Sequence, residues 1–251
     1  MKIRINPLNW GTARVIDLQK VLESVVHVMD SYFESKIDSD ITVKHDQIDG
    51  PMVLYSRGSN GEYQVLLSAK DTFWAQYSYQ FSHEYCHIRT NYIDGHAKTK
   101  WFEETICELA SLFTLRRMSE VWKISPPYKN WSDYNSALYD YAENLTTDED
   151  LKLPDGVEFL EWFKANLSAL ENDQYMREAN AIIAIKLLSI FEANTKLWLA
   201  VTYLNTWVIT GDDNIYQLFD NWLSCVPNEL KPVVNILAHE FGAKDLNNYD
   251  N

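Results

Sequence analysis

Residues 83 to 87 constrain this chain more than any other stretch, because they read His83-Glu84-Tyr85-Cys86-His87. In an α-helix, residues four apart lie one turn from each other on the same face. The imidazoles of His83 and His87 would then both reach a single metal ion, with Glu84 beside them. A hydrolytic zinc ion has three protein ligands and keeps one position open for water. The pattern therefore predicts a metal-binding helix and requires a third ligand elsewhere in the chain.

The surrounding residues fit an amphipathic helix from about Trp74 to Asn91. One stripe at helical spacing is polar and contains Gln76, Gln80, His83 and His87, whereas a separate stripe is apolar and contains Phe81, Tyr85 and Ile88. The alternative is that the two histidines are ordinary residues of an amphipathic helix. The glutamate between them and the acidic helix downstream favour the metal-binding interpretation.

A second helix is predicted from Trp101 to about Met118. Its apolar stripe consists of Phe102, Ile106, Leu109 and Phe113. Glu104 and Glu108 lie one turn apart on another face. The linker at 92–100 is short enough to return the chain directly, which would let Glu104 approach the histidines. His96 in this linker is a rival ligand, although a loop histidine beside a glycine is more often exposed to solvent.

With this motif and the acidic helix after it, the chain resembles the gluzincin branch of zinc metallopeptidases. The stretch Trp101-Phe102-Glu103-Glu104 is similar to the Trp-x-x-Glu segment of aminopeptidase-type gluzincins, and the resemblance covers residues 62 to 118. It implies that His83, His87 and Glu104 are the zinc ligands. It also implies that Glu108 accepts a hydrogen bond from a zinc-bound histidine, which fixes the tautomer of that ring. The sequence separation between His87 and Glu104 is shorter than the corresponding separation in the best-known members, and Glu108 stands where the family has Asp. Glu108 and Glu103 therefore remain alternative third ligands.

The same resemblance implies a mechanism in which Glu84 is the general base for a zinc-activated water. It further implies that the strand before the motif helix holds an extended peptide by backbone hydrogen bonds, which points to Tyr63, Val65 and Leu67 as substrate-binding residues. The alternative is that this strand is interior and touches no substrate. A donor to the oxyanion is expected from the second lobe, and the sequence does not choose among Tyr134, Tyr139, Tyr141, Tyr175, Tyr203, Tyr216 and His239.

The remaining pattern predicts an α+β fold. Strands are expected at 2–6, 41–47, 51–55 and 62–67, and an amphipathic helix at 13–33. Asn60-Gly61 between the last two strands is a strong hairpin signal, so we expect a small, mostly antiparallel sheet. Pro126-Pro127 marks the predicted boundary between a zincin-like catalytic lobe, 1–125, and an all-helical lobe, 126–251. Helices of that second lobe are expected at about 132–145, 157–171, 173–192, 195–208, 213–224 and 229–241.

Charge and cysteine content narrow the class of partner and the location. The formal net charge of −14 argues against nucleic acid and anionic membranes as partners, because Lys and Arg side chains favour binding to both. The start of the chain lacks the apolar run of a signal peptide, and no stretch is apolar enough to span a bilayer. Cys86, Cys107 and Cys225 do not make a disulfide framework, so a reducing cytoplasm is expected. We interpret Cys86 and Cys107 as small buried apolar residues rather than ligands.

These observations together predict a cytoplasmic zinc-dependent metallopeptidase that acts on a peptide or protein substrate. One alternative is a zinc hydrolase of a non-peptide amide. Another is a catalytically inactive zincin-like binding or regulatory protein, which the presence of Glu84 disfavours. A third is a helical interaction protein in which the motif arose by chance, and metal content separates that case from the others.

Overall fold

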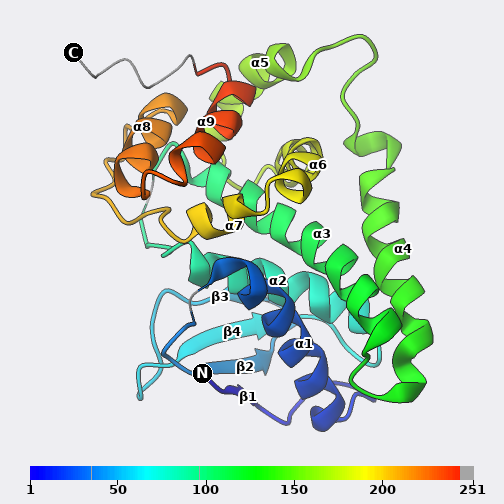
Figure 1. Cartoon of the computed structure of the whole chain (residues 1–251). Helices are drawn as coiled ribbons and strands as arrows, with labels where there is room; N and C mark the ends of the chain where they lie inside the picture. Colours follow the sequence, from blue (N-terminus) through cyan, green and yellow to red (C-terminus); the bar gives the residue numbers. More distant parts are fainter. Residues whose placement is uncertain (35, 96, 244–251) are drawn as a thin grey trace. The chain divides into compact units, whose positions relative to one another are not determined.

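The computed structural model, drawn in Figure 1, describes residues 1–34, 36–95 and 97–243. These residues divide into two compact units. Unit 1 comprises 1–88 and 110–146, and unit 2 comprises 89–109 and the described residues from 147 on. The predicted lobe boundary at 125/126 falls within unit 1. Helix α3 (Lys100–Ile124) is continuous and contributes to both units.

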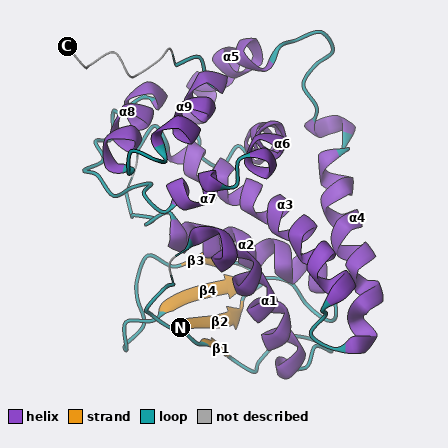
Figure 2. Cartoon of the chain, in the orientation of Figure 1, coloured by secondary structure: helices purple, strands orange, loops and turns teal. Residues whose placement is uncertain are grey.

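Unit 1 contains a four-stranded sheet made of β1 (Ile3–Ile5), β2 (Ile41–His45), β3 (Met52–Val53) and β4 (Tyr63–Leu67), in the order β1-β2-β4-β3 (Figure 2). Strands β1 and β2 pair parallel, as do β2 and β4, whereas β3 pairs antiparallel with β4. The predicted hairpin is therefore confirmed, but the prediction of a mostly antiparallel sheet is wrong. The reason is that helix α1 (Val15–Phe33) connects β1 to β2, and a helical crossover joins parallel strands.

The core of unit 1 follows the alternation of the strands and the helical period of α1. Ile41, Val43, Val65 and Leu67 are completely buried in the sheet, and the buried apolar residues of α1 are Leu18, Val21, Leu22, Val25, Val28, Met29 and Phe33. α1 contacts β1. The predicted helix at 13–33 is thus confirmed, and the sheet provides the platform on which the rest of the unit is built.

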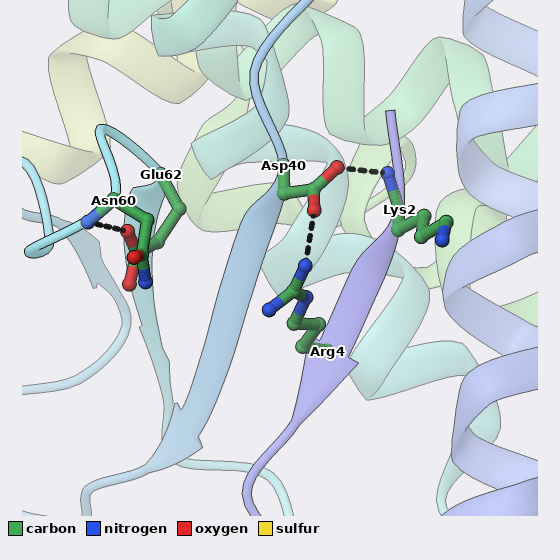
Figure 3. A network of polar contacts seen from close by, with 5 residues as sticks. All are labelled: Lys2, Arg4, Asp40, Asn60 and Glu62. Atoms are coloured by element: carbon green, nitrogen blue, oxygen red, sulfur yellow. Dashed lines mark hydrogen bonds and ion pairs between the residues drawn. The ribbon is translucent and has the colours of Figure 1, made fainter.

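Asp40, directly before β2, ties the starts of the three parallel strands together (Figure 3). Its carboxylate accepts hydrogen bonds from the Lys2 backbone nitrogen and from Arg4 Nη2, each at 2.8 Å. Its backbone oxygen accepts from the Tyr63 nitrogen at 2.9 Å. Before β4, the Asn60 nitrogen donates to Glu62 Oε2 at 2.9 Å (Figure 3). These contacts fix the register, which matters because a shift of one residue would turn every side chain to the other face.

Unit 1 is completed by helix α2 (Trp74–Arg89) up to residue 88, the second part of α3, the short 3₁₀ helix η1 (Lys129–Tyr134) and helix α4 (Asn135–Thr146). The predicted helices at 74–91, 101–118 and 132–145 are therefore present, with η1 replacing the start of the last one. Among the described residues, no helix has both the length and the hydropathy needed to cross a bilayer.

Unit 2 is helical. It contains the first part of α3, the short 3₁₀ helix η2 (Glu149–Leu151), and helices α5 (Phe159–Asn172), α6 (Arg177–Ala193), α7 (Lys196–Val201), α8 (Ile215–Cys225) and α9 (Lys231–Glu240). The predicted helices after residue 150 are confirmed, although α7 is shorter than the predicted 195–208. The core of the unit is aromatic, and the ring of Phe102 lies 5.5, 6.1 and 5.7 Å from the rings of Phe219, Trp222 and Phe241. The start of α3 is therefore anchored in this core.

Candidate metal centre

Helix α2 places the two motif histidines on one face. His83 and His87 are part-buried, and their ring centroids lie 5.0 Å apart with an interplanar angle of 62°. The opposite stripe is buried as predicted, since Phe81, Tyr85 and Ile88 are at most 4% exposed. The one-turn spacing that the sequence implied for the two imidazoles is thus confirmed in the folded chain.

Gln80, one turn before His83 on the polar stripe, anchors α2 to the end of β4. Its Oε1 accepts hydrogen bonds from the backbone nitrogens of Ser68, at 3.1 Å, and Ala69, at 3.0 Å. Its Nε2 donates to Ser68 Oγ at 2.9 Å. Because Gln80 is only 7% exposed, this part of the polar stripe serves the protein interior rather than the solvent.

Two side-chain contacts join α3 to the α2 segment, one within each unit. In unit 1, Ser111 Oγ donates to the Tyr79 carbonyl oxygen at 2.9 Å. In unit 2, Thr90 Oγ1, just after α2, donates to Glu103 Oε1 at 2.8 Å. His83 and His87 lie between these two contacts on α2, and residues 104–110 lie between them on α3.

The described residues bring His83, His87 and Cys107 together as a group that could hold a metal ion. One ligand atom from each residue lies within 4.8 Å of the other two. Nitrogen and sulfur atoms bound to a tetrahedral zinc at about 2.0 to 2.3 Å are about 3.3 to 3.6 Å apart. Small side-chain movements would therefore bring this group onto one ion, and imidazole and thiolate are donors that suit zinc.

Glu104 and Glu108, the predicted third ligand and its supporting acid, are part-buried on α3. Glu104, Cys107, Glu108 and Ser111 stand at helical spacing and so share a face of α3. Neither glutamate belongs to the three-residue group found among the described residues. The roles of Glu104 as ligand and Glu108 as a support for a histidine remain predictions.

Glu103, the other alternative ligand, is occupied by structural hydrogen bonds within unit 2. Its Oε1 accepts from Thr90, and its Oε2 accepts from Asn205 Nδ2 at 3.0 Å. Asn205 Nδ2 also donates to the Thr90 carbonyl oxygen at 3.0 Å. This arrangement favours a role for Glu103 in holding the linker between α2 and α3, rather than in binding a metal.

Strand β4 carries the residues that the resemblance assigned to substrate binding. It lies inside the sheet, paired with β2 on one side and with β3 on the other, in agreement with the interior alternative. Val65 and Leu67 are completely buried, and Tyr63 lies under the Arg57 guanidinium at 3.1 Å from its ring centroid. Substrate binding by strand addition at Tyr63, Val65 and Leu67 therefore gains no support from the sheet.

Cys107 is the member of the group that sequence reasoning missed. We interpreted it as a small buried residue, and it is indeed completely buried, as is Cys86. The sequence signal that could have identified Cys107 as a ligand is its position three residues after Glu104, on the same face of the same helix. The rival ligand His96 lies outside the described residues.

One of the candidate oxyanion donors lies against α2 in unit 1. The ring of Tyr141, on α4, is 5.6 Å from the ring of Tyr79, which is one turn before His83. The hydroxyl of Tyr134 accepts a hydrogen bond from the Ala75 nitrogen at 3.2 Å, at the start of α2. Tyr134 thus has a structural role at the helix terminus, whereas Tyr141 contacts α2 one turn before His83.

Comparisons of the chain with family models, with curated proteins and with solved structures find no match. The fold and the site therefore define the class by themselves, as an α+β protein with a mostly parallel sheet, a mostly helical remainder, and two histidines and a cysteine that could bind a metal.

Proposed function

We propose that the chain is a metal-dependent hydrolase that uses zinc to cleave peptide bonds. The proposal is carried by one observation, the pair of imidazoles on a single face of α2 with a further ligand atom from α3 within 4.8 Å. Two histidines at this spacing with a glutamate directly after the first are the arrangement from which hydrolytic zinc sites are built. The cysteine content continues to favour a reducing cytoplasm as the location.

In this proposal each residue has one task. His83 and His87 hold the ion, and a residue of α3 supplies the third ligand. When bound, zinc lowers the pKa of a water molecule to about 7 and polarises the carbonyl of the substrate. Glu84, which is 3% exposed and adjacent to His83 in sequence, accepts a proton from water and delivers it to the leaving amine. The Tyr141 hydroxyl donates a hydrogen bond to the oxygen on which negative charge develops.

The direct test is Glu84→Gln, with peptide hydrolysis and metal content measured on the same preparations. We expect the variant to retain its metal and to lose at least about a hundredfold in kcat, because an amide cannot accept the proton. Glu23→Gln on α1 is a matched control with an exposed carboxylate in the same unit. Full activity in Glu84→Gln would overturn the mechanism.

Metal content also tests the ligands. We expect about one zinc per chain in the wild type and none in His83→Ala, while His27→Ala, which removes an exposed histidine of α1, retains it. A wild type that takes up no metal after supplementation would remove the hydrolase proposal altogether. Metal binding without turnover on peptides, followed by turnover on small amides, would move the proposal to the non-peptide class. Zinc without hydrolysis of either class would favour the inactive regulatory protein.

A further inference from the structure

Two side chains on α3 are candidates for the third metal ligand, and the chemistry of the metal centre depends on which of them binds the ion. Glu104 is the choice implied by the family resemblance, whereas Cys107 is the residue whose sulfur lies within 4.8 Å of the ligand atoms of both histidines. On α3 itself, Cys107 lies in sequence between Glu103, which accepts a hydrogen bond from Thr90 in unit 2, and Ser111, which donates one to Tyr79 in unit 1.

From this geometry we propose that Cys107, not Glu104, is the third protein ligand, so that two imidazoles and one thiolate bind the ion. The inference rests on the proposed function and specifies its metal. A thiolate is a soft ligand that favours Zn²⁺ and Co²⁺, whereas Mg²⁺, Ca²⁺ and Mn²⁺ prefer oxygen ligands. Cys107 is completely buried, so its thiolate would be shielded from bulk solvent when it is bound to the ion.

A buried cysteine is usually a small apolar residue, and the chain contains an internal comparison for that case. Cys86 is on α2, between Glu84 and His87 in sequence, and is as deeply buried as Cys107. It is nevertheless not in the group of ligand atoms found among the described residues. Burial alone therefore does not distinguish the two cysteines, and proximity to both imidazoles does.

The experiment replaces the native metal with Co²⁺ and records the near-ultraviolet spectrum, where a thiolate bound to Co²⁺ gives an intense charge-transfer band. We expect the band in the wild type, in Cys86→Ser and in Glu104→Gln, and its loss in Cys107→Ser. Metal affinity in Cys107→Ser should fall by more than the roughly 10- to 100-fold that loss of an outer-shell partner costs. Circular dichroism and thermal unfolding of the metal-free variants show whether each one folds.

A second measurement needs no variant. X-ray absorption of the zinc-loaded wild type should show one sulfur at about 2.3 Å together with nitrogen or oxygen neighbours at about 2.0 to 2.1 Å. A shell without sulfur, or a charge-transfer band that persists in Cys107→Ser, would overturn the assignment of Cys107. If in addition Glu104→Gln abolishes binding, the carboxylate is the ligand and the hydrolase proposal survives. A wild type that binds neither Zn²⁺ nor Co²⁺ would overturn both proposals.

Discussion

Asn205 shows how single polar residues hold the segment that follows α2. Its amide nitrogen donates to the Thr90 carbonyl oxygen and to Glu103 Oε2, each at 3.0 Å. Its backbone φ of 59° lies in the left-handed region, which asparagine tolerates better than most residues. Asn91, with a φ of 56°, donates in return to the carbonyl oxygens of Thr202 and Leu204. The two asparagines thus lock the linker to the residues after α7, within unit 2.

We predict that Asn205→Ala lowers the free energy of unfolding by about 1 to 3 kcal/mol, because it removes two hydrogen bonds, one of them to the Glu103 carboxylate. Asn205→Gly is the matched variant, since it also removes the amide but accepts the left-handed backbone. Urea unfolding of both variants separates the two effects. If Asn205→Gly is as stable as the wild type, the hydrogen bonds contribute nothing and only the backbone conformation matters.

Tyr141 gives a prediction about activity rather than stability. If its hydroxyl stabilises the developing negative charge, Tyr141→Phe should lower kcat by about 10²-fold while metal content stays unchanged. Tyr139→Phe, on the same helix with an exposed side chain, should retain its activity. A Tyr141→Phe variant with full kcat would remove the residue from the proposed mechanism.

At the level of single residues, the sequence predicted some members of the candidate metal site and missed another. The pairing of His83 and His87 follows from local spacing on one helix, which is determined by the backbone period alone. Cys107 could not be found this way, because it lies on a different helix, far from the histidines in sequence. Cysteine is also among the most buried residue types, so a buried structural role was the favoured interpretation.

The elements show the same division between local and long-range information. The helices were predicted because the period of apolar residues is a local signal, and the hairpin between β3 and β4 was predicted from Asn60-Gly61. The parallel pairing of β1, β2 and β4 was not, because it depends on connections through α1 and across β3 rather than on any strand's own sequence. The order that puts β4 inside the sheet follows from the same connections, and it leaves β4 paired with a strand on either side.

Gln80 links the element that carries the histidines to the sheet. Gln80→Ala would leave the backbone nitrogens of Ser68 and Ala69 without their acceptor, so we expect a loss of about 1 to 3 kcal/mol in the free energy of unfolding. Metal affinity should fall as well, because α2 is then held less firmly one turn before His83. Gln76→Ala is the control, with the same residue type on the same stripe and a part-buried side chain. Equal effects of the two substitutions would show that the anchor to β4 has no special importance.

At the scale of the whole molecule, three aspartates that accept backbone hydrogen bonds contribute to the response of the fold to acid. The backbone nitrogen and then the hydroxyl of Thr12 donate to Asp71 and hold its pKa below the usual value. The pKa of Asp46 is lowered by hydrogen bonds from the backbone nitrogens of Asp49 and Ile48. That of Asp40 is lowered first by the Lys2 nitrogen and then by Arg4. All three groups therefore favour the folded state when they are ionised.

The sign of the pH dependence follows from these lowered pKa values. An unfolded aspartate titrates at about 3.9, so between that value and the lower folded pKa the unfolded chain binds more protons. The stabilisation is complete above the unfolded pKa and is lost as the pH falls through the folded pKa. We therefore expect the urea midpoint of the metal-free protein to change little between about pH 5 and 7 and to decrease when the pH is lowered below about 4.

In Asp71→Asn the urea midpoint should be lower at pH 7 and should decrease less on acidification, because one of the three carboxylates no longer contributes. Asp155→Asn removes an exposed loop carboxylate and provides the control. A midpoint in Asp71→Asn that equals that of the wild type at both pH 7 and pH 3 would show that the contact between Thr12 and Asp71 does not stabilise the fold.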